Sequence, residues 1–135
     1  MSTRIRCLLA MLGTDVHSKG IRTLAQLLRD FGVEVIYLGE HNTAEGLIQA
    51  MIAEDVDIVG LSFSVATYLH YTRDLLQKMR AAGVDDIPLM IGGLIHAEDE
   101  PALHEMGVKG IFGPGSTTPQ IAEFIERITG KSLAG

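Results

Sequence analysis

Asp15 and His17 stand two positions apart in a polar segment, Gly13–Gly20, where their side chains can act together. In this spacing a carboxylate can accept a hydrogen bond from one imidazole nitrogen and leave the other nitrogen free for a ligand. Carboxylates behind metal-bound histidines do this, fixing the tautomer and making the imidazole a stronger ligand. The segment holds no second His or Cys, which argues against a conventional zinc site. Taken alone, this spacing is more often explained by a histidine that only caps a polar loop or faces water.

Two further segments consist of small residues, and the first of them also carries hydroxyl groups. Ser62 and Ser64 each offer one hydrogen bond and leave room for a bulky ligand, although an ordinary strand end with Thr67 capping the next helix also explains them. The pair Gly92-Gly93 lets a backbone approach a ligand closely, but a turn with positive φ is the more frequent reason for such a pair. Both segments are therefore candidate ligand contacts with a plain structural alternative.

The segment 112–119, FGPGSTTP, predicts an open loop that leads into the last helix. Thr117 or Thr118 can cap that helix. A phosphate-binding role has little support, because the loop contains neither G-x-G-x-x-G nor the lysine of a P-loop.

Apolar β-rich runs alternate with amphipathic helical patterns along the chain, and these elements must position the four segments. Strands are predicted at Ile5–Leu12, Val33–Leu38, Asp57–Ser62, Ile87–Ile91 and Gly110–Phe112. Helices are predicted at Gly20–Phe31, Ala44–Glu54, Thr67–Ala82, Glu98–Met106 and Thr117–Ile128. The first helix should bury Ile21, Leu24, Ala25, Leu27 and Leu28, and the second, capped by Thr43, should bury Leu47, Ile48, Met51 and Ile52.

This alternation predicts an α/β fold with a single doubly wound, five-stranded parallel sheet, of the Rossmann or flavodoxin-like kind, with strand order 2-1-3-4-5. We expect one domain over residues 1–130 and a frayed tail at 131–135. Ligands of such sheets bind at the carboxyl ends of the strands, near the point where the strand order reverses. The four segments follow the first, third, fourth and fifth strands, so they should surround one crevice.

Composition and net charge argue against several classes of function. The 135 residues include 11 Lys and Arg against 17 Asp and Glu, a net charge of −6, which argues against nucleic acid as a partner. No apolar run is long enough to span a membrane, and the N-terminal apolar run reads as the first strand rather than a signal peptide. The single Cys7 should be buried, and one cysteine fits a reducing cytoplasm. The chain is short for an enzyme that must enclose a large substrate alone.

The pattern Asp15-x-His17-x-x-Gly20, followed by Ser62 and then Gly92-Gly93, resembles the D-x-H-x-x-G…S-x-L…G-G signature of cobalamin-binding domains. These domains occur in adenosylcobalamin-dependent mutases and in methionine synthase. Ser62 lies 45 positions after His17 and Gly92 lies 75 positions after it, spacings that fit the signature. The resemblance covers nearly the whole chain.

The resemblance implies that the nucleotide tail of the cofactor leaves the cobalt and enters a slot between the first and third strands. His17 then becomes the lower axial ligand of cobalt, with Asp15 orienting it from behind. Ser62 is implied to hydrogen-bond the buried dimethylbenzimidazole. The cofactor-binding residues that the resemblance implies are Asp15, Val16, His17, Ser18, Lys19, Gly20, Ser62, Ser64, Gly92, Gly93, Phe112, Gly113, Gly115 and Ser116.

Segment 92–116, GGLIHAEDEPALHEMGVKGIFGPGS, resembles the corresponding part of acyl-CoA mutases of the methylmalonyl-CoA, isobutyryl-CoA and 2-hydroxyisobutyryl-CoA types. This implies a small cobalamin-binding subunit whose adenosylcobalamin starts a radical rearrangement by Co–C homolysis. The acyl-CoA would be held by a separate large β/α-barrel subunit, and a G-protein chaperone is a further implied partner. No catalytic residue beyond the cobalt ligand is then expected on this chain.

The chain also departs from the family pattern. Acyl-CoA mutases commonly read D-G-H-D-R-G, whereas Val16, Ser18 and Lys19 occupy the variable places here. Met11 stands where these mutases often carry a lysine, and Ser64 replaces the leucine of S-x-L. These departures leave the subgroup, and hence the substrate, open.

Three alternatives remain at this point. Glutamate mutase small subunits are similar but usually carry a longer insertion after the paired glycines. Corrinoid carriers and cobalamin-dependent sensors usually add an N-terminal helical bundle, for which this chain has no segment. A receiver-type regulator would need an acceptor aspartate where Ser62 stands.

Overall fold

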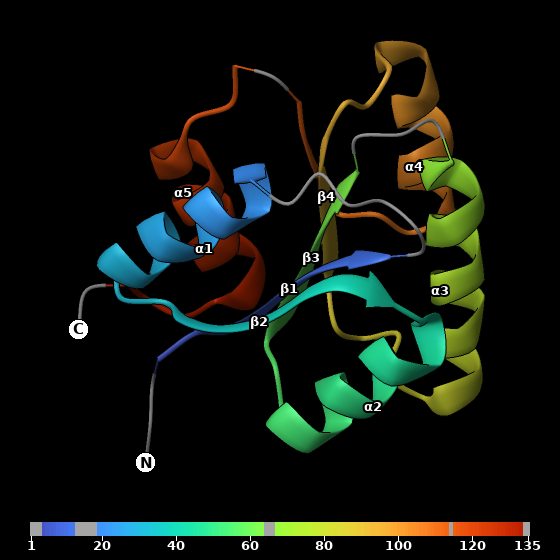
Figure 1. The fold of residues 1–135 in the computed structure, drawn as a ribbon, viewed down its shortest axis with the longest axis horizontal. Coiled ribbons are helices and arrows are strands. Elements are labelled where there is room, and N and C mark those ends of the chain that lie inside the picture. The colour runs from blue at the N-terminus through green and yellow to red at the C-terminus, as the bar shows by residue number, and fades with distance from the viewer. Residues whose placement is uncertain (1–3, 13–18, 64–66, 114, 134–135) are drawn as a thin grey trace.

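The central sheet of the computed structural model contains five parallel strands in the order β2-β1-β3-β4-β5 (Figure 1). The structure describes residues 4–12, 19–63, 67–113 and 115–133. The strands are β1 (Arg6–Leu12), β2 (Glu34–Asn42), β3 (Ile58–Phe63), β4 (Leu89–Gly93) and β5 (Gly110–Phe112). The helices are α1 (Lys19–Asp30), α2 (Ala44–Glu54), α3 (Tyr68–Ala82), the 3-10 turn η1 (Ala97–Asp99), α4 (Glu100–Met106) and α5 (Thr118–Thr129). The predicted fold class and strand order are confirmed.

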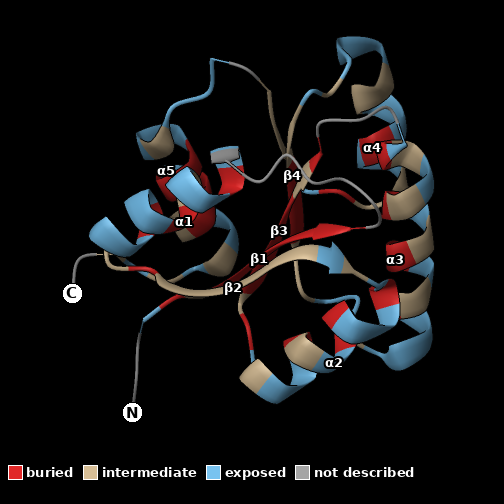
Figure 2. Ribbon diagram, viewed as in Figure 1, coloured by how far each residue is buried: buried red, intermediate tan, exposed pale blue. Residues whose placement is uncertain are grey.

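Helices cover both faces of the sheet, as in every doubly wound fold. On one face α1 and α5 pack together, and on the other α2, α3 and α4 form the covering layer (Figure 1). Each face has its own apolar core; β1, β3 and β4 are buried along most of their length, whereas β2 at the edge of the sheet is mostly half-buried (Figure 2). Cys7 lies fully buried in β1, as predicted, and burial raises the pKa of its thiol to about 12.

The β2 strand extends to Asn42, four residues beyond the predicted end at Leu38. Two register irregularities between β1 and β2 let the longer strand stay paired as far as Leu12. The side chain of Asn42 donates hydrogen bonds to the carbonyl groups of Met11 (3.0 Å) and Gly39 (2.8 Å). These contacts close the end of β2 against the end of β1.

Three local predictions were wrong. Leu27 is 39% exposed and Ile52 is 60% exposed, so neither belongs to the core. The inner face of α2 passes through Leu47, Ile48 and Met51, and Ile52 is turned away from it in the last turn. Thr67 occupies the N-cap position of α3, but its side chain makes no capping hydrogen bond, because its backbone is not extended there.

Two other caps form as predicted. The Thr43 hydroxyl accepts from the backbone N–H of Gly46 at 3.0 Å. Thr117 and Gln120 form a reciprocal capping box at the start of α5. The last helix is thereby held at a defined start beside the loop that follows β5.

Residues 131–133, which we expected to be loose, contact the domain. The Lys131 ammonium lies 3.0 Å from the Asp57 carboxylate, and the backbone N–H of Leu133 donates to Glu126 at 2.8 Å. Within the described ranges, no helix combines the length and the apolar character needed to cross a bilayer.

Candidate functional site

A cavity of about 320 Å³ lies between the sheet and the two helices α1 and α5. Its walls come from β1, β3, β4, the β5–α5 loop and the facing sides of both helices. The predicted site residues that line it are Gly20, Ser62, Gly92, Gly93, Phe112, Gly113, Gly115 and Ser116. The fold therefore brings together residues from four separate parts of the sequence, as the shared edge of the sheet predicted.

The paired glycines are required by packing within the protein. Gly93 has a φ of +105°, and a Cβ atom there would lie 2.0 Å from the carbonyl oxygen of Phe63. At Gly92 a Cβ atom would lie 2.9 Å from the carbonyl oxygen of Phe112. Packing within the protein is thus a sufficient reason for the two glycines. Their backbone, which carries no side chain, still forms part of the cavity wall.

Three other glycines of the cavity leave space that no atom of the described residues fills. Within the part of the chain that the structure describes, a Cβ atom at Gly20, Gly113 or Gly115 would meet no heavy atom within 4 Å. Gly115 also has a φ of +94°, which favours glycine, but the space at Gly20 and Gly113 has no such backbone reason. This open volume at the cavity is what a bulky, planar ligand group would need.

The floor of the cavity is apolar. Gly60 lies at the centre of β3, and a Cβ atom there would come within 2.7 Å of Leu9 and 2.9 Å of Met90. All three residues line the cavity, so the two long side chains pack over the glycine and form its base. Ligand pockets are commonly lined in this way, with apolar walls and few polar groups that set orientation.

The polar groups of the cavity are hydroxyls. Ser62 is half-buried at the carboxyl end of β3, in register with Gly92 of β4. Among the described residues we find no hydrogen-bond partner for the Ser62 side chain, so its hydroxyl is available to a ligand. Ser116 and Thr118 add hydroxyls from the loop before α5 and from its first turn.

Phe112, which lines the cavity, belongs to an aromatic pair. The ring of Phe112 packs edge-on against Phe124 of α5, with centroids 5.3 Å apart. A Cβ atom at Gly110 would lie 2.6 Å from the Phe124 ring, so only glycine admits that ring against β5. Phe124 thereby holds Phe112 at the cavity.

Sequence reasoning missed the helical walls. Thr23, Leu24 and Leu27 of α1 line the cavity, as does Ile121 of α5. The signal was present, because positions three, four and seven residues after Gly20 share one helix face with it. Leu27 was assigned to the core instead, and its partial exposure reflects its place beside the cavity.

Part of the predicted site lies outside the described residues, namely Asp15, Val16, His17, Ser18 and Ser64. Lys19 is the first residue of α1, and its side chain is likewise not described. The chain enters the first of these stretches from β1 and leaves it into α1, two elements that both contribute to the cavity.

Comparison with known proteins gives a consistent result. The family model described as B12 binding domain matches residues 5–122. The pivalyl-CoA mutase small subunit of Xanthobacter autotrophicus is 35% identical over 96% of this chain and 87% of its own length. The 2-hydroxyisobutanoyl-CoA mutase small subunit of Aquincola tertiaricarbonis is 36% identical over 82% of this chain and 81% of its own length.

Solved structures match the fold. A novel cobalamin-binding protein from Desulfitobacterium hafniense DCB-2 superimposes with a TM-score of 0.80 at 21% identity, over 93% of this chain and 59% of that one. A putative response regulator from Chloroflexus aurantiacus superimposes with a TM-score of 0.70 at 15% identity, over 95% and 100% of the two chains. Because proteins of different function share this architecture, function has to be argued from the site.

Proposed function

The chain belongs to the B12-binding domain family, and from this premise we propose that it is the cobalamin-binding small subunit of an adenosylcobalamin-dependent carbon-skeleton mutase acting on an acyl-CoA. The extent of the sequence match supports a small-subunit role. It spans more than four-fifths of two mutase small subunits, but only 17% of the methylmalonyl-CoA mutase large subunit of Streptomyces virginiae.

The observation that carries the proposal is the cavity between the sheet and helices α1 and α5. It offers glycines that leave open space, an apolar floor and a half-buried serine hydroxyl without a described partner. A planar apolar base with one polar edge needs these three properties. The residues present therefore fit the dimethylbenzimidazole end of a cobalamin tail.

In the proposed roles, this chain binds and orients the cofactor. Gly20, Gly113 and Gly115 give the tail room, and the hydroxyl of Ser62 donates a hydrogen bond to its base. Gly92, Gly93, Phe112 and Ser116 form the walls around it. The mostly apolar lining excludes water from the tail.

The cobalt end is assigned to the loop before α1. We propose that His17 would ligate the cobalt and that Asp15 would hold its imidazole in the required tautomer. Val16, Ser18, Lys19 and Ser64 would complete the contacts to the cofactor in this proposal. When bound, adenosylcobalamin supplies the radical chemistry that protein side chains cannot provide.

The proposed partner is a large β/α-barrel subunit that holds the acyl-CoA, with a G-protein chaperone as a second proposed partner. The relatives named small subunits support the first of these. Under this division of labour the isolated chain binds cobalamin but does not turn over any acyl-CoA.

The test is electron paramagnetic resonance of the chain loaded with cob(II)alamin. If His17 ligates cobalt, protein made with ¹⁵N-histidine should replace the threefold nitrogen splitting of each cobalt line by a twofold one. His17→Ala should remove this isotope effect, whereas His41→Ala, at an exposed histidine of β2, should keep it. A nitrogen splitting that does not change with ¹⁵N-histidine would refute the assignment. An isotope effect that persists in His17→Ala would also refute it.

A further inference from the structure

Tyr68 joins two elements at the carboxyl edge of the sheet. It is the first residue of α3, and only 1% of its surface is exposed. Its hydroxyl group donates to the Asp99 carboxylate of η1 and accepts the backbone N–H of His96 at 3.0 Å. Its ring lies 6.2 Å from the ring of Phe63. Burial, and then the hydrogen bond to Asp99, raise the pKa of this phenol.

The segment that Tyr68 holds, Gly93–Asp99, begins in the cavity wall. The backbone N–H of Leu94 donates to the carbonyl group of Phe63 at 2.8 Å, next to the tight contact of Gly93. Beyond this point the segment leaves the sheet, and Leu94 is 58% exposed. Among the described residues, we find no side chain from outside the segment other than Tyr68 that hydrogen-bonds it.

We infer that Tyr68 is a positioning residue for the cavity, because its hydroxyl holds the Gly93–Asp99 segment and thereby fixes the bare backbone of Gly93 in the wall. The inference rests on the proposed function, in which the cofactor's nucleotide tail fills this cavity. A backbone wall has no side chain that can adjust to a ligand, so its position decides the fit. Because this wall is already ordered in the folded protein, binding of the tail does not carry the entropy cost of ordering the wall.

Removing the hydroxyl leaves the His96 N–H and the Asp99 carboxylate without this partner, while the aromatic ring can still fill its place. Tyr68→Phe should therefore fold and should loosen the segment. The backbone N–H of His96 should exchange with solvent faster in Tyr68→Phe than in the wild type, measured without any cofactor. This readout is independent of mutase activity.

The decisive measurement compares two corrinoids by spectroscopic titration, aquocobalamin, which has the nucleotide tail, and diaquocobinamide, which lacks it. Tyr68→Phe should raise the Kd of aquocobalamin about 3- to 10-fold, the size expected for a residue that acts through another. The Kd of the cobinamide should not change. Asp99→Asn keeps an oxygen acceptor and should restore most of the affinity that Asp99→Ala loses.

Tyr71→Phe is the matched control, because Tyr71 is half-buried on the same helix and its hydroxyl has no hydrogen-bond partner among the described residues. It should leave both titrations at wild-type values. An unchanged Kd for aquocobalamin in Tyr68→Phe and Asp99→Ala would overturn the inference, as would an equal loss for both corrinoids. A wild-type chain that binds no cobalamin would instead contradict the proposed function itself.

Discussion

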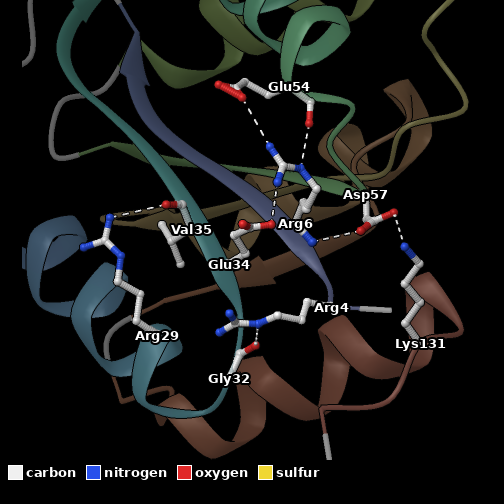
Figure 3. A network of polar contacts seen from close by, with 9 residues as sticks. All are labelled: Arg4, Arg6, Arg29, Gly32, Glu34, Val35, Glu54, Asp57 and Lys131. Atoms are coloured by element: carbon white, nitrogen blue, oxygen red, sulfur yellow. Dashed lines mark hydrogen bonds and ion pairs between the residues drawn. The ribbon is translucent and has the colours of Figure 1, made fainter. Parts of the chain in front are cut away.

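The two edges of the sheet are built from opposite kinds of residue. At the amino edge, the guanidinium of Arg6 pairs with Glu34 and Glu54, and the backbone N–H of Arg6 donates to Asp57 at 2.8 Å (Figure 3). Asp57 in turn pairs with Lys131 near the C-terminus. At the carboxyl edge, glycines and hydroxyl residues surround a cavity. Long charged side chains tie elements together at one edge, and short ones leave room at the other.

This difference indicates that side-chain contacts which stabilise the fold lie at the amino edge, and that the proposed cofactor site lies at the carboxyl edge. The amino edge connects β1, β2, α2, the start of β3 and the C-terminal residues through side chains that reach each other. The carboxyl edge has no side-chain packing at Gly20 and Gly113, where an added Cβ atom would meet none of the described atoms within 4 Å. Gly83 and Gly130, at the C-caps of α3 and α5, are equally open but do not line the cavity, so under the proposed function only the space at Gly20 and Gly113 would receive the ligand. Stability and cofactor binding should therefore respond separately to changes at the two edges.

The largest loss of stability is expected at Gly93, a residue of the carboxyl edge that is tightly packed against the protein backbone. Gly93→Ala forces a Cβ atom against the Phe63 carbonyl at a positive φ, so it should lower the free energy of unfolding by about 3 kcal/mol or more. Urea denaturation measures this. Gly113→Ala lines the same cavity without any contact within 4 Å and should change stability by about 0.5 kcal/mol or less. Equal losses in the two variants would contradict the distinction between packed and open glycines.

An intermediate effect is expected at the amino edge. Arg6→Met keeps the apolar stem but removes the ion pairs and the hydrogen bond from Nε to the Glu54 carbonyl at 2.7 Å. Because its partners are more than 40% exposed, the loss should be about 1–2 kcal/mol rather than the larger cost of a buried pair. Lys131→Met, at a single pair, should cost about 0.5 kcal/mol.

Neither amino-edge variant should alter the Kd of aquocobalamin, measured by titration under conditions where the protein stays folded. A clear change in that Kd would break the separation of the two edges. It would mean that the charged network sets the geometry of the cavity across the length of the sheet.

At Gly20 the change in stability should be small and should have the opposite sign. Gly20 lies in the first turn of α1, and alanine there should raise the free energy of unfolding by about 0.5 kcal/mol through helix propensity. The added methyl group projects into the open space, so the Kd of aquocobalamin should rise about tenfold. Gly113→Ala should weaken binding without the gain in stability. Tighter binding by Gly20→Ala would refute the role of this space.

Much of the fold was predictable because local patterns determine it. The periodicities placed every strand and helix within a few residues, and short connections of alternating type left the order β2-β1-β3-β4-β5 as the first choice. The shared edge of Ser62, Gly92 and the Phe112–Ser116 loop followed from that order. The position of these residues along the chain was enough, because the carboxyl ends of parallel strands always meet at one edge.

Contacts between distant parts of the chain were not predictable. Arg6 meets Glu54 and Asp57, about 50 positions away, and Tyr68 meets Asp99, 31 positions away. No local pattern distinguishes these charged or aromatic residues from solvated ones. Leu27 was misplaced for the same reason, since only the packing of α1 against α5 decides whether a leucine on that face is covered.

The alternation of elements, the order of the strands, the burial of Cys7 and the edge at which small residues gather could all be predicted from the amino-acid sequence. This was possible because periodicity, turn residues and parallel connections are local properties of the chain. Only the tertiary structure decided which glycines are packed and which are open, because that depends on atoms brought from other strands and helices. It also decided that Tyr68 anchors the wall behind Gly93, since a buried hydroxyl acquires its role from partners that only the fold places beside it.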